Sequence, residues 1–356
     1  MRSTMSTRPV ITGIGLITPL GFTPDEVLRR IAAGETAATA PAFDAAPFSC
    51  QVCAPVRNFE PQRYVAEAKL LRLMNREAQF SVAAAHLALQ DARLEVGRAY
   101  APADIALFGA TGLAGLPLGE VGPLLRASIT PEGRFDPARF GQSGLRSISP
   151  LLSFKILGTR PLCFVSICEN IQGENAIYTP WENQGVQAIV AGCAAIASGR
   201  ARCALVGGCD VKTHELAFLA LEQLGVFASW RETGAGFVPG EGAAYLVLEA
   251  EDAARQRGAH LYARLAQSSE QPLTGVIAAA NGNRALEQDE ATALVNSGVA
   301  PCDWLQPKKS IGDLFAAAAA VQVALGAVMA EKISGAVLAR CAGFRSEPAA
   351  FVLEHA

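Results

Sequence analysis

The sequence predicts an α/β protein built from layers of helices and strands, and three features of the chain favour this fold class. Short apolar strands alternate with helical segments along all 356 residues. Some helical segments, such as residues 185–197, consist mainly of small residues, which suits helices buried between other layers. The chain is 51% hydrophobic and only 18% charged. A large core is therefore expected, and the low charge suggests that an oligomer covers part of the surface.

The expected elements follow in chain order. A strand at residues 9–15 comes first, and Thr23 is placed to cap a helix that ends near residue 33, with two acidic residues in its first turn. The apolar spacing of residues 76–92 predicts the next helix. The remaining predictions are strands at 104–109, 175–180 and 202–208, helices at 185–197 and 214–224, paired strands at 242–248 and 261–266, helices at 289–297 and 314–329, and strands at 337–340 and 349–353. Residues 126–146, rich in Gly, Pro and Arg, predict a loop.

Charge and cysteine usage exclude several classes of function. The net charge is −3 and no run of Lys or Arg exceeds two residues, so no nucleic-acid partner is expected. The CxxC pair Cys50 and Cys53 has no second pair or nearby histidine, so no metal site is expected. An odd number of scattered cysteines predicts reduced thiols and a cytoplasmic protein. The N-terminus lacks a signal-peptide cleavage site, and the apolar run 316–330 is expected to be too short to span a membrane.

Eight stretches carry a resemblance to a known family. They are RPVITGIGLITPLG, MNREAQFSVAAAHLALQDARL, SPLLSFKILGT, QGEN, VGGCD, GFVPGEGAAYLVLE, the run from Lys308 to Asp313, and GFRSEPAAFVL. In this order they resemble the β-ketoacyl synthases of the thiolase fold. The resemblance implies an αβαβα layered architecture with two fused, pseudo-equivalent halves. The expected halves are residues 1–235, with insertions, and residues 236–356, packed as one compact unit.

The resemblance also marks where catalytic residues should lie. The family uses a cysteine at the N-terminus of a buried helix, where backbone N–H groups favour the thiolate, together with two histidines. At the matching positions this sequence has Glu182, Asn281 and Asp313. Lys308 and Glu241 match supporting residues of the family, and here they are expected to pair with each other. Phe344 matches the phenylalanine of the family's gating loop, but Arg345 and Ser346 replace the glycines after it.

Bulky residues surround the nucleophile position. Trp181 stands where the family has a small alanine, Pro180 where it has threonine, and Tyr178 is also bulky. One interpretation is that Trp181 and Tyr178 plug the acyl pocket by steric exclusion. The other is that they are ordinary core aromatics.

A glutamate at this position leaves open a decarboxylase, a hydrolase, or a chain that has lost catalysis. A carboxylate is a much poorer acyl acceptor than a thiolate, so condensation by this chain alone is not expected. Glu182 and Asp313 could instead share a proton and serve a decarboxylase or hydrolase of malonyl- or acyl-carrier-protein thioesters, with Asn281 donating to an oxyanion. Alternatively, the three replacements followed the loss of catalysis. The sequence favours this last hypothesis.

The resemblance implies a specific non-catalytic role. In type II polyketide systems, an active ketosynthase often pairs with a chain-length factor that has lost the cysteine. The chain is expected to be such a subunit, with residues 175–179 pairing across the dimer axis and the corner at 109–116 shaping product length. The expected partners are an active ketosynthase and an acyl carrier protein, which carries substrates on phosphopantetheine, with no separate cofactor. Exposed Arg63, Arg72 and Arg76 could contact that acidic carrier, or they could simply be solvated.

Overall fold

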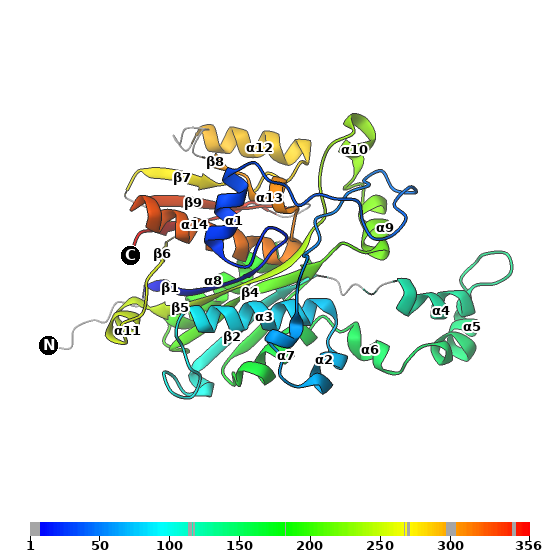
Figure 1. The fold of residues 1–356 in the computed structure, drawn as a ribbon, viewed down its shortest axis with the longest axis horizontal. Coiled ribbons are helices and arrows are strands. Elements are labelled where there is room, and N and C mark those ends of the chain that lie inside the picture. Colours follow the sequence, from blue (N-terminus) through cyan, green and yellow to red (C-terminus); the bar gives the residue numbers. More distant parts are fainter. Residues whose placement is uncertain are drawn as a thin grey trace.

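The computed structural model describes residues 8–112, 116, 118–181, 183–266, 268, 271–296, 304–343 and 347–356 (Figure 1). The strands are β1 (Pro9–Ile17), β2 (Ile105–Thr111), β3 (Asn175–Tyr178), β4 (Cys203–Val211), β5 (Glu241–Ala250), β6 (Ala263–Ala266), β7 (Leu273–Ile277), β8 (Trp304–Leu305), β9 (Ala336–Cys341) and β10 (Ala349–Glu354). The helices are α1 (Pro24–Ala32), α2 (Ala68–Leu73), α3 (Arg76–Asp91), α4 (Leu118–Ser128), α5 (Pro137–Arg139), α6 (Leu151–Lys155), α7 (Arg160–Glu169), α8 (Asn183–Ala197), α9 (Glu215–Gln223), α10 (Ala228–Thr233), α11 (Glu251–Gln256), α12 (Arg284–Val295), α13 (Pro307–Ile311) and α14 (Ala318–Ile333). Two short helical turns also matter below: the π-helical turn η3 (Phe140–Gly144) and the 3₁₀ turn η6 (Phe315–Ala317).

The strand order repeats between the two halves of the chain. The strands lie in the order β3-β2-β4-β5-β1-β6-β10-β9-β7-β8. From each edge of the sheet inward, the same pattern of parallel and antiparallel pairing is found. In each half the outer pairings are parallel, β3/β2/β4 and β8/β7/β9, and the inner ones antiparallel, β4/β5/β1 and β9/β10/β6. A short antiparallel pairing of β1 with β6 joins the halves. This arrangement confirms the predicted α/β fold with two pseudo-equivalent halves.

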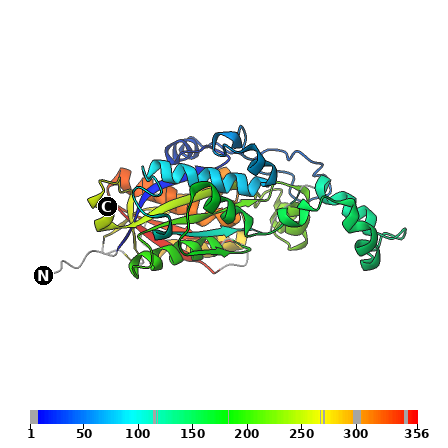
Figure 2. The same cartoon turned by 90° about the horizontal axis from the view of Figure 1, so that it is seen from below.

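Helices form layers around these strands, as Figures 1 and 2 show. On the first half, α3 packs against β1 and β5, and α7 lies beside α3 and contacts β2. Helices α8 and α14 contact each other and lie between the two halves, with α8 against β2 and β4 and α14 against β9 and β10. Helix α12 packs through Leu294 on Val276 of β7. The layers therefore alternate as α, β, α, β, α.

Small residues allow this close packing. Gly15 in β1 faces α3 so closely that a Cβ at this position would lie 1.9 Å from the carbonyl oxygen of Ala84. Apolar side chains from both faces of the first half build two large core clusters, one shared with α8 and α14 and the other with α3 and α7. The abundance of alanine in the buried helices is thus a packing requirement, because larger side chains would separate the layers.

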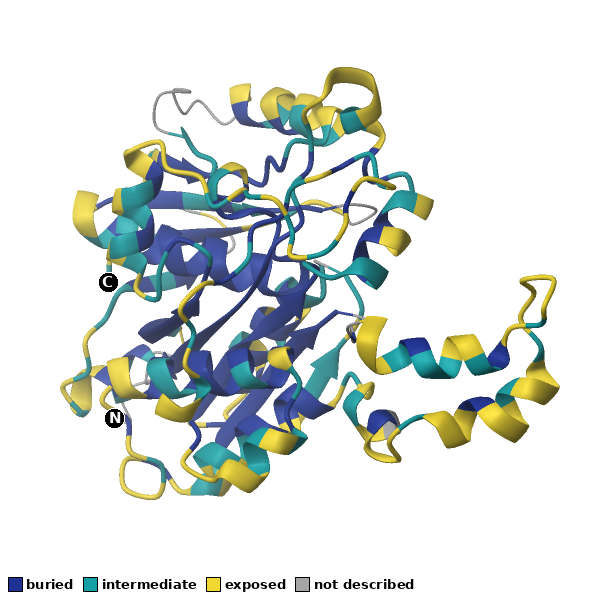
Figure 3. Ribbon diagram, turned by 45° about the vertical axis from the view of Figure 1, so that its right-hand side comes forward, coloured by how far each residue is buried: buried dark blue, intermediate teal, exposed yellow. Residues whose placement is uncertain are grey.

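An arm projects from this body between β2 and α7 (Figures 1 and 3). It contains α4, α5, η3 and α6, which pack mainly on one another. The expectation of a loop at residues 126–146 was therefore wrong in part, since α4 continues to Ser128 and α5 follows after a cap by Asp136. Pro123 inside α4 and Pro137 at the start of α5 obscured these helices in the sequence.

One other expectation needs correction. Strands β5 and β6 do not pair with each other, because β1 lies between them. By strand order β5 lies among the strands of the first half. The boundary expected between residues 235 and 236 stays a prediction.

One helical segment has the dimensions of a membrane span. In the described part of the chain, Phe315–Ile333 is long and apolar enough by composition to cross a membrane, although the sequence suggested too short a run. Its apolar window is 78% buried inside the fold. The segment is the middle-layer helix α14 preceded by η6, and its hydrophobicity serves the core.

Candidate functional site

The position of the family's nucleophile lies between β3 and α8, where the sequence places it. Glu182 itself is outside the described residues, and α8 begins directly after it at Asn183. Gly185 fixes the start of α8 against η6, because a Cβ there would lie 2.8 Å from the carbonyl oxygen of Ala316. The helix N-terminus is thus held against the loop that carries Asp313.

Asp313 and Asn281 meet in the core beside this helix. Asp313 is only 1% exposed, and its Oδ2 accepts a hydrogen bond of 2.9 Å from the Asn281 amide. Its Oδ1 accepts from the backbone N–H of Phe315 at 2.9 Å. The side-chain oxygen Oδ1 of Asn281 in turn accepts from the backbone N–H of Asn283.

Lys308 completes the cluster. Its ammonium lies 2.9 Å from Oδ2 of Asp313 and donates to the carbonyl oxygen of Ala342 at 2.8 Å. Both oxygens of Asp313 are therefore engaged, one of them by a buried cation. The hydrogen bonds of this carboxylate are thus directed to groups of the chain itself.

The expected pairing of Lys308 with Glu241 was wrong. Glu241 is buried and binds Arg76, with the closest nitrogen 2.6 Å away. The Glu241 carboxylate also accepts from the Thr213 hydroxyl at 2.6 Å and from the N–H of Val56 at 2.8 Å. Each buried carboxylate thus has its own cation, Arg76 for Glu241 and Lys308 for Asp313. Arg76 is therefore not simply a solvated surface residue, because its guanidinium is already paired with Glu241.

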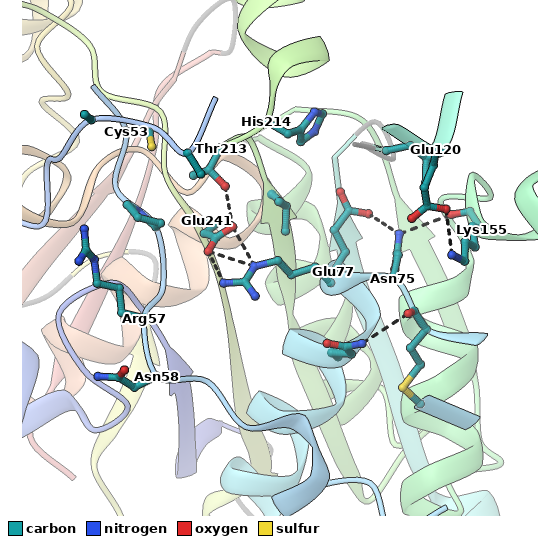
Figure 4. Close-up of a pocket in the computed structure, with 18 residues that line it drawn as sticks. Cys53, Arg57, Asn58, Asn75, Glu77, Glu120, Lys155, Thr213, His214 and Glu241 are labelled. Carbon is teal, nitrogen blue, oxygen red and sulfur yellow. Dashed lines mark hydrogen bonds and ion pairs between the residues drawn. The ribbon is translucent and has the colours of Figure 1, made fainter. Parts of the chain in front are cut away.

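The Glu241–Arg76 pair lines a cleft of about 820 Å³ (Figure 4). Asn75, Glu77, Glu120 and Lys155 line its other side, where Lys155 lies 2.9 Å from Glu120. Figure 4 shows Glu241 beside Thr213 and Glu120 beside Lys155, so both carboxylates are engaged by groups of the chain itself.

Lys308 borders a hollow that has no room for a water molecule. Asn183, Val186 and Ala342 are among the other residues that line it. A separate cleft of about 440 Å³ reaches Asn281 and Glu290. Burial raises the pKa of Glu290, and the N–H of Ala279 donates to its carboxylate.

Trp181 and Tyr178 are both half-buried. Trp181 packs against a cluster of phenylalanines that includes Phe218 and Phe237, and it lines an apolar hollow of about 120 Å³ with Leu221. Tyr178 packs against the core cluster around α8. These contacts fit both interpretations of the two aromatics, so the plug stays a prediction. Phe344, the expected gate, lies outside the described residues.

His214 is a site residue that the sequence did not single out. Its Nδ1 accepts the N–H of Ala217 and caps α9, and the ring borders both the large cleft and the hollow beside Trp181. Burial and the nearby Lys212 lower the pKa of His214 to about 4, so the ring is neutral. His214 directly precedes the acidic first turn of α9, which is typical of an N-cap position. Histidine is an uncommon N-cap residue, so the sequence did not indicate this role. Within the described residues, no three His, Cys, Asp or Glu side chains gather closely enough to hold a metal ion.

Three features of the described surface leave apolar groups or a strand edge exposed. Among the described strands, β3 pairs only with β2, which leaves its outer edge open. Helix α8 exposes Val190, and the groove beside it, of about 450 Å³, is lined only by apolar residues and Cys193. The arm adds a group of exposed apolar side chains: Leu118, Leu125, Ile129, Phe135, Leu145, Leu151, Phe154, Ile156 and Leu157. Open strand edges and large apolar patches are typical of surfaces that another chain covers.

Comparisons with known proteins agree with this geometry. The model of the family described as "Beta-ketoacyl synthase, N-terminal domain" matches residues 7–254. The 3-oxoacyl-[acyl-carrier-protein] synthase 2 of Coxiella burnetii is 29% identical over 270 residues, which cover 72% of this chain and 61% of that protein. The tetracenomycin polyketide synthase ketoacyl synthase beta subunit of Streptomyces glaucescens is 25% identical over 357 residues, covering 88% of this chain and 83% of that one. The match to the synthase 2 relative thus spans less than two thirds of its length.

Solved structures share the fold. The ishigamide ketosynthase/chain length factor has a TM-score of 0.79 at 21% identity and covers 99% of this chain and 100% of its own. A type II polyketide synthase complex of a ketosynthase with its acyl-carrier protein has a TM-score of 0.75 at 16% identity, over 98% of this chain and 99% of that one. At these identities the likeness concerns the fold, and the αβαβα architecture expected of a thiolase-like protein is confirmed.

Proposed function

Because the chain belongs to the β-ketoacyl synthase family, we propose that it is a non-catalytic, chain-length-factor-type subunit. It pairs with an active β-ketoacyl-carrier-protein synthase, and the pair elongates polyketide or fatty-acyl chains in a type II system. The observation that carries this proposal is the buried cluster of Asp313, Asn281 and Lys308, in which every oxygen of the carboxylate is occupied.

The chemistry of condensation explains why this cluster matters. A ketosynthase needs a thiolate to accept the acyl chain and imidazoles to assist decarboxylation and stabilise the enolate. Glutamate supplies no thiolate at position 182, and the Asn281 amide has no titratable proton. Asp313 neutralises Lys308 and cannot serve water as a free base. The same engagement of Asp313 argues against the decarboxylase or hydrolase alternative.

The exposed apolar features support a partner subunit. The open edge of β3 can pair with a second strand, as expected for residues 175–179, and the apolar face of α8 would then lie against the partner. The projecting arm can extend over that second chain. The second chain that covers this surface is an active ketosynthase in this proposal. An acyl carrier protein delivers the substrates on its phosphopantetheine. Trp181 narrows the acyl path in this chain, so the growing product occupies the partner's side.

Expression of this chain alone and together with an active ketosynthase tests the proposal. The pair should form a 1:1 complex that lengthens an acyl-carrier-protein thioester, and this chain alone should not. Within the complex, Glu182→Ala should leave the elongation rate nearly unchanged, whereas replacing the partner's own nucleophile should abolish elongation. A two-carbon-longer product made by the purified chain alone would refute the proposal.

A further inference from the structure

Arg160 is a buried cation without a hydrogen-bond acceptor. It is the first residue of α7, where the arm returns to the body, and it is only 2% exposed. Its Nε, Nη1 and Nη2 atoms are all buried, and none has an acceptor among the described residues. A guanidinium has five N–H donors and retains its charge in proteins, so leaving all of them unpaired in the core is costly.

Two aromatic rings enclose this guanidinium. The Arg160 carbon Cζ lies 4.3 Å from the ring centroid of Phe154 and 5.1 Å from that of Phe164. Contacts with ring faces offset part of the charge but accept none of the in-plane N–H donors. Burial also lowers the pKa of Arg160. An anionic group that accepts hydrogen bonds from the Arg160 guanidinium would therefore stabilise it.

The outer ring belongs to the exposed apolar surface at the base of the arm. Phe154 is 44% exposed while Phe164 is buried, and Leu151, Ile156 and Leu157 surround the same turn with about half of their surface exposed. Arg160 thus lies directly beneath an apolar patch, with one ring between its guanidinium and the outside.

This patch is continuous with the open edge of β3. The carbonyl oxygen of Gly158 accepts a hydrogen bond from Thr111 at the end of β2, the strand that pairs with β3. A Cβ at Gly158 would lie 3.6 Å from the methyl group of Thr179, which follows β3. A chain that pairs with β3 would therefore reach the surface above Arg160.

We propose that the partner subunit contributes an Asp or Glu carboxylate that binds Arg160 after the Phe154 ring moves aside. The planar guanidinium matches a carboxylate with two parallel hydrogen bonds, and desolvation by the surrounding apolar side chains strengthens the pair. Arg160 is then a determinant of partner choice, since a subunit without the acid leaves the cation unpaired. This inference rests on the proposed function, because it assigns chemistry to that partner.

The test compares the isolated chain with its complex. Arg160→Met removes the charge but keeps an apolar chain of similar length, so the isolated variant should have a higher Tm than the wild type. The Kd of Arg160→Met for the ketosynthase partner should increase about 30-fold or more, as expected when one member of a buried charge pair is removed. Arg160→Lys keeps the charge without the planar fork, so its Kd should lie between those of the wild type and Arg160→Met.

Arg202→Met provides the matched control. The Arg202 guanidinium lies 5.0 Å from the Tyr100 ring but is exposed, so its replacement should change neither Tm nor Kd greatly. A purely structural Arg160 would give a lower Tm and an unaltered Kd for Arg160→Met, and this result would overturn the inference while leaving the proposed function intact. If the wild-type chain binds no ketosynthase at all, the proposed function fails and the inference fails with it.

Discussion

The Asn281 amide and the Lys308 ammonium bind the same oxygen of Asp313, each at 2.9 Å. One anion thus neutralises a buried cation and orients an amide in a place where the family keeps histidines for catalysis. The cluster is closed on the side of α8. Its arrangement is that of a structural network, in which each polar group depends on the others.

Removing Asp313 should therefore destabilise the protein strongly. Asp313→Ala leaves the Lys308 ammonium buried without its counter-charge, and the free energy of unfolding should fall by about 3–5 kcal/mol. The double variant Asp313→Leu/Lys308→Met removes both charges and should recover much of this loss. Urea denaturation of the single and double variants measures both values. Equal stability of Asp313→Ala and the wild type would contradict a structural role for the cluster.

The second buried carboxylate gives a test of the corrected pairing. Glu241 and Arg76 are in contact, so a double-mutant cycle of Glu241→Gln with Arg76→Met should yield a coupling of about 1 kcal/mol or more. The cycle of Glu241→Gln with Lys308→Met should be additive within about 0.5 kcal/mol, because these residues have separate partners. Coupling in the second cycle and none in the first would restore the pairing expected from the sequence.

Much of the fold could be predicted because local signals and the motifs agreed. Thr23 and Asn75 cap α1 and α3 with side-chain oxygens, and the small residues of α8 lie in the middle layer as expected. The partner of Glu241 could not be predicted, since Arg76 lies 165 residues away in the chain. Asp313 follows Lys308 by only five residues, but their contact depends on the turn after the short α13, which the sequence did not indicate.

The arm and Arg160 show a different limit. The sequence of residues 118–157 has prolines and glycines that mask its helices, and many of its apolar residues are exposed, so their spacing shows no clear period. Arg160 precedes a proline at the start of α7, which is typical of an exposed helix terminus. In the fold, Phe154 of α6 and Phe164 of α7 enclose its guanidinium.

The interpretation of Trp181 as a plug predicts a change in ligand binding. Trp181→Ala should enlarge the hollow of about 120 Å³ beside Leu221, and the variant should bind a non-hydrolysable medium-chain acyl-pantetheine analogue more tightly than the wild type does. Calorimetric titration measures the two affinities. Trp230→Ala is the control, because Trp230 packs on the same phenylalanine cluster without lining the hollow. Equal affinities in all three proteins would favour ordinary core packing.

His214 predicts how stability depends on pH. Burial lowers the pKa of its imidazole from 6.5 to about 4 in the folded protein, so the unfolded chain binds more protons than the folded one between these values. The free energy of unfolding should therefore decrease as the pH falls from about 6.5 to about 4, by on the order of 2 kcal/mol from this residue. Protonation would also remove the acceptor that caps α9. Thermal unfolding at a series of pH values measures the slope.

His214→Asn isolates the contribution of this imidazole, because asparagine can still cap α9 but does not titrate. The variant should lose less stability than the wild type between pH 6.5 and 4. His86 provides the opposite sign: a hydrogen bond to Glu169 raises its pKa, so it stabilises the fold below pH 6.5 and loses this effect as the pH rises. His86→Asn should accordingly leave the loss below pH 6.5 nearly unchanged and make stability fall less than in the wild type as the pH rises above 6.5. If His214→Asn follows the wild-type curve between pH 6.5 and 4, His214 does not remain neutral in the folded state, and another group governs the loss of stability in acid.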